Sequence, residues 1–320
     1  MLTRSILAIA FAALATTSAA AQNWPDRPIR FLMSAPAGSS IDVLGRAIAD
    51  KLSARLGQPV VVEDKPAAGG TVATAEVAHA APDGYTMLLA FNGPLSFAPL
   101  LQKLPYDVHR DLAPVITTTS QPNVLVVNAE LPVHSLAELV AYAKAHPGKL
   151  NYASVGNGSS SHLCMELFKQ LAGIDVVHIP FNGSPPAVTA TIKDETQMMF
   201  AVMQPLQPQI DAGKLRAIAV TTAKPFPLFP NIPSIAQSGY PGFEVLAWNG
   251  VMVPAATPKP IIARLNSEIN AILEDPDIVT RMHRLGFDLV GGTPAQFGAL
   301  VRGETEKWAP VIRKIGLKID

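Results

Sequence analysis

The stretch IRFLMSAPAGSSIDVLGRAIADKLSARLGQPVVV (residues 29–62) places a strand, a turn, a helix and a second strand in succession. Its apolar run at 29–34 predicts the first strand. Apolar residues then recur every three or four positions through 41–56, which predicts an amphipathic helix that ends near Gly57. The run at 60–62 predicts the next strand. Because this order of elements builds a parallel unit covered by helices, the stretch predicts an α/β fold.

The same alternation continues through most of the chain and restarts after Asp111. Further strands are expected at 85–91, 122–128, 150–154, 176–181, 197–203, 215–222 and 243–253, and further helices at 71–80, 135–145, 160–172, 186–192, 207–212, 259–274, 277–284 and 294–313. Two such units predict two lobes. We expect lobe 1 to comprise 22–118 and 223–320 and lobe 2 to comprise 119–222. The chain is expected to cross between them near Pro114–Thr119 and Thr221–Lys224.

The N-terminus predicts export from the cytoplasm. Residues 1–21 contain one early arginine, an apolar core at about 6–14 and a small-residue triplet before Gln22, as in a cleavable signal peptide. No cysteine follows the cleavage site, so we expect a free periplasmic protein without a lipid anchor. The single cysteine, Cys164, rules out an intramolecular disulfide and is interpreted as a buried apolar residue.

Composition and motifs argue against several classes of protein. The formal net charge is zero and only 16% of residues are charged, which does not fit a nucleic-acid surface. The stretch GNGSSS begins like a dinucleotide-binding motif, but its third glycine is replaced by Ser161. There is no phosphate-binding GxxxxGK[ST] loop, no GxSxG motif and no cluster of metal ligands. Ser161 and His162 are adjacent and do not form a catalytic pair. We therefore expect neither an enzyme nor a cofactor or metal.

Two uncharged, hydroxyl-rich turns remain, APAGSS (35–40) and GNGSSSH (156–162). Each follows an apolar strand and opens a helix, so each should present unpaired backbone N–H groups at a helix N-terminus. Those donors and the helix dipole bind anions without a basic side chain. Asp42 is expected to fix the first turn by accepting backbone N–H groups. The alternative is that both turns are ordinary capped helix starts.

The chain resembles the substrate-binding proteins of tripartite tricarboxylate transporters, the Bug family. The resemblance is carried by WPDRPIRFLMSAPAGSS and the residues after it, DLAPV (111–115), HSLAELVAYAKAHPGKLNYAS (134–154), PNIPSIAQSGYPGFE (230–244) and VPAATPKPIIARLN (253–266). It implies a two-lobed periplasmic-binding-protein fold of type II-like form, each lobe a mostly parallel sheet flanked by helices, with a ligand cleft between the lobes. It also implies a monomer that closes by a hinge on a small carboxylate and delivers it to membrane permease subunits.

The resemblance also implies which residues bind the ligand. From the first lobe these are Ala35, Pro36, Ala37, Gly38, Ser39, Ser40, Asp42, Asn92 and Gly93, and from the second lobe Ser159, Ser160, Ser161, His162, Phe181, Asn182, Gly183 and Ala201, together with Trp248. Phe91 and Phe200 are interpreted mainly as core residues. The turn PAAGG (66–70) is interpreted as mainly structural, since glycine there eases a tight turn.

Two departures from the family pattern bear on the ligand. Ala35 stands where the family often has an aromatic residue, which leaves room for a bulkier or aromatic acid. Ala201 stands where amino-acid-binding members have an aspartate, so a ligand ammonium group would lack a counter-charge. We therefore expect an organic acid rather than an amino acid. Two other functions stay open, an extracytoplasmic sensor partner for the same acid and a secreted serine hydrolase that uses Ser161 and His162.

Overall fold

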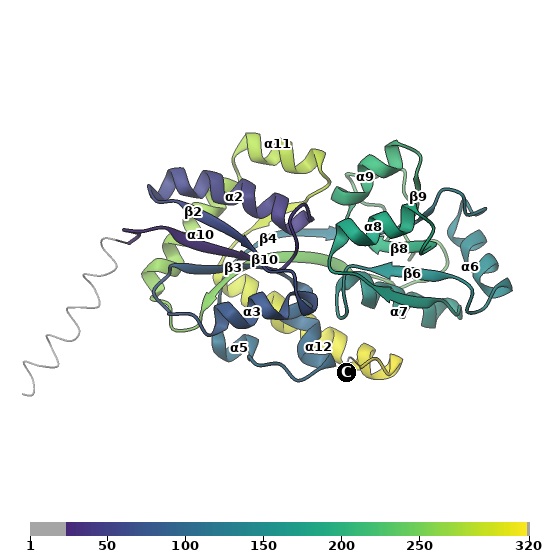
Figure 1. Cartoon of the computed structure of the whole chain (residues 1–320), viewed down its shortest axis with the longest axis horizontal. Coiled ribbons are helices and arrows are strands. Elements are labelled where there is room, and N and C mark those ends of the chain that lie inside the picture. The colour runs from purple at the N-terminus through teal and green to yellow at the C-terminus, as the bar shows by residue number, and fades with distance from the viewer. Residues whose placement is uncertain (1–23, 319–320) are drawn as a thin grey trace, which may run out of the picture.

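A computed structural model describes residues 24–318. The predicted signal peptide, 1–21, lies outside these residues. Between residues 24 and 318, every helix is too short or too polar to cross a membrane. The fold consists of two lobes joined side by side, each built on one sheet (Figure 1).

The first lobe has a six-stranded sheet in the order β11-β4-β10-β3-β1-β2. Its strands are β1 (Ile29–Met33), β2 (Val60–Asp64), β3 (Thr86–Phe91), β4 (Leu112–Pro122), β10 (Leu246–Pro254) and β11 (Leu289–Gly291). Its helices are α2 (Ser40–Leu56), η1 (Ala68–Gly70), α3 (Thr71–Ala78), η2 (Gly93–Phe97), α4 (Ala98–Leu101), α5 (Val108–Asp111), α10 (Lys259–Leu273), α11 (Pro276–Arg284) and α12 (Pro294–Ile315). Alternate side chains of β1 enter different cores, because Phe31 packs with α2 and α10 and Leu32 packs with α3 and α12.

The second lobe has a five-stranded sheet in the order β7-β6-β8-β5-β9. Its strands are β5 (Val124–Asn128), β6 (Asn151–Ser154), β7 (Val177–Pro180), β8 (Met198–Ala201) and β9 (Leu215–Val220). Its helices are α6 (Leu136–Ala145), α7 (Ser160–Ala172), α8 (Ser184–Ile192) and α9 (Met203–Asp211). Here Phe200 joins the core beneath α6 and α7, and its neighbours Met199 and Ala201 join the core beneath α8 and α9. Cys164 is fully buried in the first of these cores, as predicted.

The two-lobed fold is confirmed, but the sheets are mixed rather than mostly parallel. β1 pairs in parallel with β2 and β3, whereas β10 is antiparallel to both β3 and β4. In the second sheet β6 is parallel to β7 and β8, whereas β5 is antiparallel to β8 and β9. The strands that follow the crossings, β5 and β10, run antiparallel to their neighbours, and at the edge of the first sheet β11 is also antiparallel to β4. In the first sheet β10 begins opposite the end of β4, because the chain returns to the sheet at the end from which it left and Leu246 pairs with Pro122.

Two connections cross between the lobes and lie against each other. The first is at Asn123, where β4 ends and β5 begins, and the second follows β9. The Asn123 amide donates to the Thr221 hydroxyl at 2.9 Å, and that hydroxyl donates to the carbonyl of Val245 at 2.5 Å. Pro114–Thr119, which we expected to form the first crossing, lies inside β4 and pairs with β10. The lobe limits of 118/119 and 222/223 stay a prediction.

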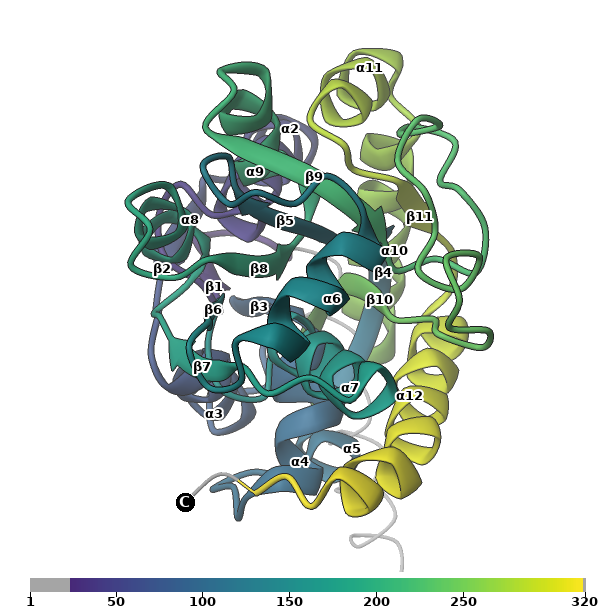
Figure 2. The ribbon, with the colours of Figure 1, turned by 90° about the vertical axis from the view of Figure 1, so that its right-hand side faces the viewer.

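Helix α12 connects the cores of the two lobes. Near its start, Phe297 packs with Trp248 in the core of the first lobe. Near its end, Trp308 and Ile312 join the main core of the second lobe. Figure 2 shows the helix running along one side of the molecule. The C-terminal helix therefore belongs to both lobes through its packing.

Candidate functional site

A cavity lies between the lobes. It is lined by Ser34, Ala35, Pro36, Ser39, Ser40, Ile41, Pro66, Ala67, Gly69, Gly70, Phe91, Asn123, Val155, Ser160, Ser161, Asn182, Gly183, Ser184, Ala201, Val202, Ala247 and Asn249. The wall contains the ends of β3 and β8 and the residues that directly follow β1 and β6. Ligands of open α/β sheets bind at the carboxyl ends of strands, so the cavity lies where the sequence predicted it.

The first uncharged turn is held in shape by bonds around the start of α2. Gly38 has φ 77°, a left-handed conformation that favours glycine. Its amide donates to Asp42 Oδ2 at 2.8 Å, and the Asp42 amide donates to the Ser39 hydroxyl at 3.3 Å. Arg46, one turn further along α2, pairs with the other carboxylate oxygen of Asp42. Asp42 therefore stabilises the turn by accepting a backbone N–H group, as expected. Its side chain does not line the cavity.

The second turn repeats this arrangement at the start of α7. Gly158 has φ 70°, and its amide donates to His162 Nδ1 at 3.2 Å. The His162 amide donates to the Ser159 hydroxyl at 3.2 Å. Ser39 and Ser159 are the N-cap residues of the two helices and share nearly the same backbone angles, with ψ values of 164° and 162°. The sequence pattern Gly-Ser-Ser-x-acceptor therefore builds one structure twice, once in each lobe.

Each repeat leaves backbone donors free at the cavity wall. Within the hydrogen bonds of the described chain, the amides of Ser40 and Ile41 in α2 have no acceptor, and neither do those of Ser160 and Ser161 in α7. All four residues line the cavity. Ser184, the first residue of α8, and Val202, the N-cap residue of α9, line the same wall. Dipoles and unpaired amides from both lobes thus converge on one space.

The cavity wall is uncharged. Among its lining residues there is no lysine, arginine, histidine, aspartate or glutamate. Between residues 24 and 318 there is also no group of three acidic, histidine or cysteine side chains that could hold a metal ion. An anion in the cavity would therefore be held by amides and hydroxyls, with the helix dipoles supplying the favourable potential.

A buried imidazole, His162, and a half-buried one, His178, support the second turn. His162 stacks on His178 with ring centroids 4.0 Å apart, and His178 stacks on Tyr152 at 4.7 Å. Burial lowers the pKa of His162 from 6.5 to about 4. Burial, followed by the effect of His162, lowers the pKa of His178 to about 3. Both rings are neutral at neutral pH, so His162 Nδ1 can accept the Gly158 N–H bond.

Ser161 and His162 are not arranged for nucleophilic catalysis. The Ser161 hydroxyl donates to the carbonyl of Phe200 at 2.6 Å, and the ring nitrogen Nδ1 of His162 is occupied by the Gly158 amide. Each side chain therefore has a structural partner of its own.

The lobes touch each other at two places beside the cavity. A Cβ atom added to Gly183 would overlap Pro36 Cγ, and one added to Gly69 would lie 2.7 Å from the carbonyl oxygen of Asn157. Pro36 and Gly69 belong to the first lobe, and Asn157 and Gly183 to the second. These contacts are close enough only because glycine has no side chain.

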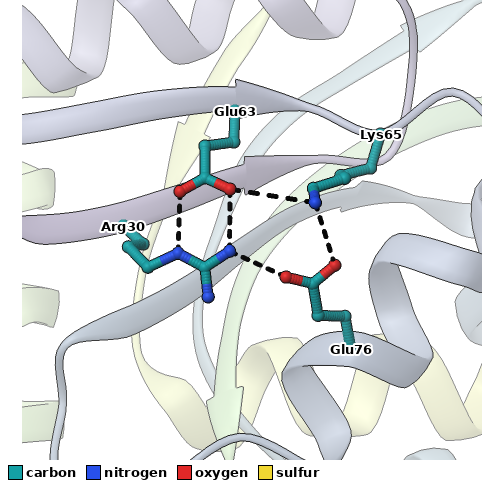
Figure 3. A network of polar contacts seen from close by, with 4 residues as sticks. All are labelled: Arg30, Glu63, Lys65 and Glu76. Atoms are coloured by element: carbon teal, nitrogen blue, oxygen red, sulfur yellow. Dashed lines mark hydrogen bonds and ion pairs between the residues drawn. The ribbon is translucent and has the colours of Figure 1, made fainter.

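The turn at 66–70 forms part of the cavity wall, which its interpretation as mainly structural did not foresee. A network of ion pairs joins the elements on either side of this turn, β2 and α3, through Arg30 of β1 (Figure 3). Arg30 forms two bonds of 2.7 Å to Glu63 and a third of 2.7 Å to Glu76, and Lys65 lies 3.3 Å from Glu76. Hydrogen bonds from Arg30 hold the pKa of both carboxyls below the usual range.

Half of the residues expected to bind ligand line the cavity. They are Ala35, Pro36, Ser39, Ser40, Ser160, Ser161, Asn182, Gly183 and Ala201. The other nine do not reach the wall. They are Ala37, Gly38, Asp42, Asn92, Gly93, Ser159, His162, Phe181 and Trp248. Several of these shape the wall indirectly, since Asp42, Ser159 and His162 hold the two turns.

Trp248 faces away from the cavity because side chains alternate along β10. Ala247 and Asn249 line the cavity, whereas Trp248 is 1% exposed and packs edge-on against Phe297 with ring centroids 5.7 Å apart. Asn92 is also buried, and its side-chain amide donates to the carbonyl of Leu246 at 2.9 Å. These residues pack in the first lobe beneath the cavity wall.

Other lining residues were not foreseen. Asn123 lies between β4 and β5 at the first crossing, Asn249 lies on β10, and Ser34 follows β1 directly. Phe91 lines the cavity and also packs against the core, while Phe200 lies wholly in the core, as interpreted. The one signal available for Ser34 was its place at the end of a predicted strand.

Comparisons with known proteins agree with this geometry. The family described as "Tripartite tricarboxylate transporter family receptor" matches residues 44–317. Protein BugT of Bordetella pertussis is 37% identical over 305 residues, which cover 93% of this chain and 92% of BugT.

Two solved structures are similar over nearly their whole length. R. palustris Rpa4515 with adipate has a TM-score of 0.89 and 32% identity, covering 92% of this chain and 99% of that one. MatC from Rhodopseudomonas palustris with bound malate has a TM-score of 0.86 and 32% identity, covering 90% of this chain and 100% of that one.

Proposed function

This chain belongs to the tripartite tricarboxylate transporter receptor family, and we propose that it is a periplasmic receptor that holds a small carboxylate between its lobes and delivers it to membrane permease subunits. The family resemblance read from the sequence is thereby confirmed. The chain is a solute-binding protein and not an enzyme. The carboxylate, the permease partner, the monomeric state and the residues of the site are parts of the proposal.

One observation carries the proposal. Free amides at the starts of α2 and α7, from opposite lobes, meet at an uncharged cavity. Ser40 and Ile41 provide two donors and Ser160 and Ser161 provide two more. A carboxylate has about four lone-pair sites, so it matches this set of donors without a basic side chain. The positive ends of both helix dipoles favour the same anion.

The relatives and the wall support an organic acid as the solute. Adipate and malate, bound by the two structural neighbours, are both small carboxylates. A bound amino acid would bring an ammonium group, and no lining residue carries a carboxylate to pair with it. Ala201 and Ala35 both line the cavity, and their small side chains leave space there for the body of the solute.

Capture requires the lobes to part and close again. The contacts of Pro36 with Gly183 and of Gly69 with Asn157 lie beside the cavity and join opposite lobes. We propose that these contacts break when the cleft opens and form when it closes around the anion. The crossings at Asn123 and Thr221 are where such a hinge would bend.

The proposal is tested by calorimetric titration of the mature protein with adipate, malate, benzoate and glutamate. We expect at least one of the organic acids to bind and glutamate to bind more weakly than that acid. Glutamate binding without any response to the three organic acids would contradict the proposed solute class.

A pair of variants at Ser40 isolates the backbone donor. Ser40→Pro removes one amide N–H, and proline is well tolerated at the first position of a helix. The preceding residue, Ser39, has φ −71° and ψ 164°, which suits a residue before proline. Ser40→Ala removes the hydroxyl alone and serves as the control. Because hydrogen bonds to charged groups contribute about 1.5–3 kcal/mol, Ser40→Pro should bind roughly 10- to 100-fold more weakly than Ser40→Ala.

Ser160→Pro with Ser160→Ala repeats the comparison in the second lobe, where Ser159 has φ −78° and ψ 162°. Equal affinities within both pairs of variants would show that the amides do not hold the carboxylate. A loss at Ser40 without a loss at Ser160 would contradict a clamp shared by the two lobes.

A further inference from the structure

Ser34 places a hydroxyl without a partner on the cavity wall. It directly follows β1, is 2% exposed, and its backbone amide donates to the carbonyl of Leu89 at 3.1 Å. Its side-chain oxygen has no hydrogen-bond partner among residues 24–318. A buried hydroxyl that leaves water without a partner lowers the stability of the protein. The position therefore calls for a partner that the protein itself does not supply.

The buried, unpaired hydroxyl distinguishes Ser34 from the other described residues of the cavity wall. Of the buried side-chain polar atoms without a partner in the described chain, only the Ser34 hydroxyl oxygen belongs to a residue that lines the cavity. Two other hydroxyls on the wall are engaged, since that of Ser39 accepts the Asp42 amide and that of Ser161 donates to the carbonyl of Phe200. Buried polar groups in native proteins are nearly always bonded, so this exception points to the bound solute.

The surroundings of Ser34 separate it from the free amides. A Cβ atom added to Gly70 would lie 3.0 Å from Ser34 Cβ and 3.1 Å from Phe91 Cε1, so Ser34, Gly70 and Phe91 form one small patch. The backbone of Gly70 is already used, because its amide donates to Ala67 at 2.9 Å and its carbonyl accepts the Thr74 hydroxyl at 2.9 Å. Gly70 forms no hydrogen bond with the Ser34 hydroxyl, and the Phe91 ring presents an apolar surface beside it.

The carboxylate does not need Ser34 either. Its oxygens are matched by the amides of Ser40, Ile41, Ser160 and Ser161, which supply as many donors as a carboxylate has lone-pair sites. We propose that Ser34 is a specificity-determining residue, and that the solute carries a hydroxyl or carbonyl oxygen, separate from the clamped carboxylate, that hydrogen-bonds the Ser34 hydroxyl. The inference rests on the proposed function and narrows its solute class to oxygen-substituted carboxylates.

The test compares carboxylates that differ by one oxygen. Calorimetric titrations of the mature protein use the pairs succinate and malate, phenylacetate and mandelate, and benzoate and 4-hydroxybenzoate. In the pair that contains the tightest ligand, the oxygen-substituted member should bind roughly 3- to 10-fold more tightly to the wild type, as for one neutral hydrogen bond. Ser34→Ala should abolish that preference and leave the affinity for the unsubstituted member within about twofold, because that member leaves the hydroxyl unpaired.

Ser40→Ala is the matched control, since it removes another hydroxyl of the cavity wall from the start of α2. It should change the affinity of both members of a pair by the same factor and so keep the preference. The thermal midpoint of the unliganded Ser34→Ala protein should equal or exceed that of the wild type, because the lost hydroxyl had no partner. A lower midpoint would show that Ser34 has a structural role instead.

The outcomes separate the two claims. If the wild type prefers the unsubstituted members, or if Ser34→Ala weakens both members equally, the inference is overturned while carboxylate binding stands. Equal weakening would mean that Ser34 contacts the carboxylate itself. If none of the carboxylates binds, the proposed function is contradicted and the inference falls with it.

Discussion

Gly69 offers the sharpest test of closure, because a side chain there would meet the opposite lobe. Its φ of 63° is left-handed, and an added Cβ would lie 2.7 Å from the carbonyl oxygen of Asn157, where ordinary contact begins at 3.4 Å. Gly69→Ala therefore leaves the closed lobes about 0.7 Å too close at this point. Overpacking of this kind costs about 1–3 kcal/mol. A penalty confined to the closed state should weaken carboxylate binding roughly 5- to 150-fold.

Gly173 supplies a matched control for the backbone strain. It has the same φ of 63°, it caps α7, and an added Cβ would meet nothing within 4 Å. Both alanine variants carry about 1–2 kcal/mol of left-handed strain and should lose a similar amount of thermal stability. Only Gly69→Ala should lose affinity in calorimetric titration, and with saturating carboxylate its radius of gyration by X-ray scattering should stay larger than that of the wild type.

The result that would refute this reasoning is an affinity of Gly69→Ala equal to that of Gly173→Ala. The contact with Asn157 would then be independent of binding, and the two lobes would not close through the face next to the turn at 66–70.

Three further predictions follow from the residues beneath the cavity wall. Asp42→Ala removes the acceptor of the Gly38 amide, so calorimetric titration should show carboxylate binding about tenfold weaker. Asp42→Asn keeps an oxygen at that place, so its affinity for the carboxylate should fall less than threefold. The native pKa values of His162 and His178, about 4 and about 3, lie below the unfolded value of 6.5, so the unfolded chain binds more protons between these values. The free energy of unfolding by denaturant should therefore fall as pH drops from about 6.5 to 4, and a flat profile would contradict the burial of neutral rings. Trp248→Phe should lower the free energy of unfolding by about 1–3 kcal/mol, because Trp248 packs against Phe297 in the core. The affinity for the carboxylate should stay within twofold of the wild type, and a loss above tenfold would place Trp248 in the site.

The sequence predicted the elements that depend on local pattern. The strand, turn and helix of 29–56 follow from apolar spacing, and the two turns were identified as helix starts with free amides because small residues and hydroxyls preceded an amphipathic stretch. Asp42 was also assigned correctly as a residue that fixes its turn, since its acceptor role involves only neighbours in the chain.

The rest depends on contacts between distant segments. Which face of β10 meets the cavity is set by its pairing with β3 and β4, so the sequence did not show that Ala247 and Asn249 line the cavity while Trp248 packs on Phe297. The sequence did not predict the mixed sheets for the same reason. The alternation of apolar residues predicts a strand but not whether that strand runs parallel or antiparallel to its neighbours after a crossing. The turn at 66–70 lines the cavity and meets Asn157 of the other lobe, a contact between segments far apart in the sequence.

The most direct test of the account is a crystal structure of the protein with the carboxylate that binds most tightly. We predict that one carboxylate group lies in the cavity with its oxygens 2.7–3.2 Å from an amide of Ser40 or Ile41 and from an amide of Ser160 or Ser161, the ordinary range of such hydrogen bonds. A carboxylate paired with a basic side chain, or held by one lobe alone, would contradict the clamp of two helix N-termini.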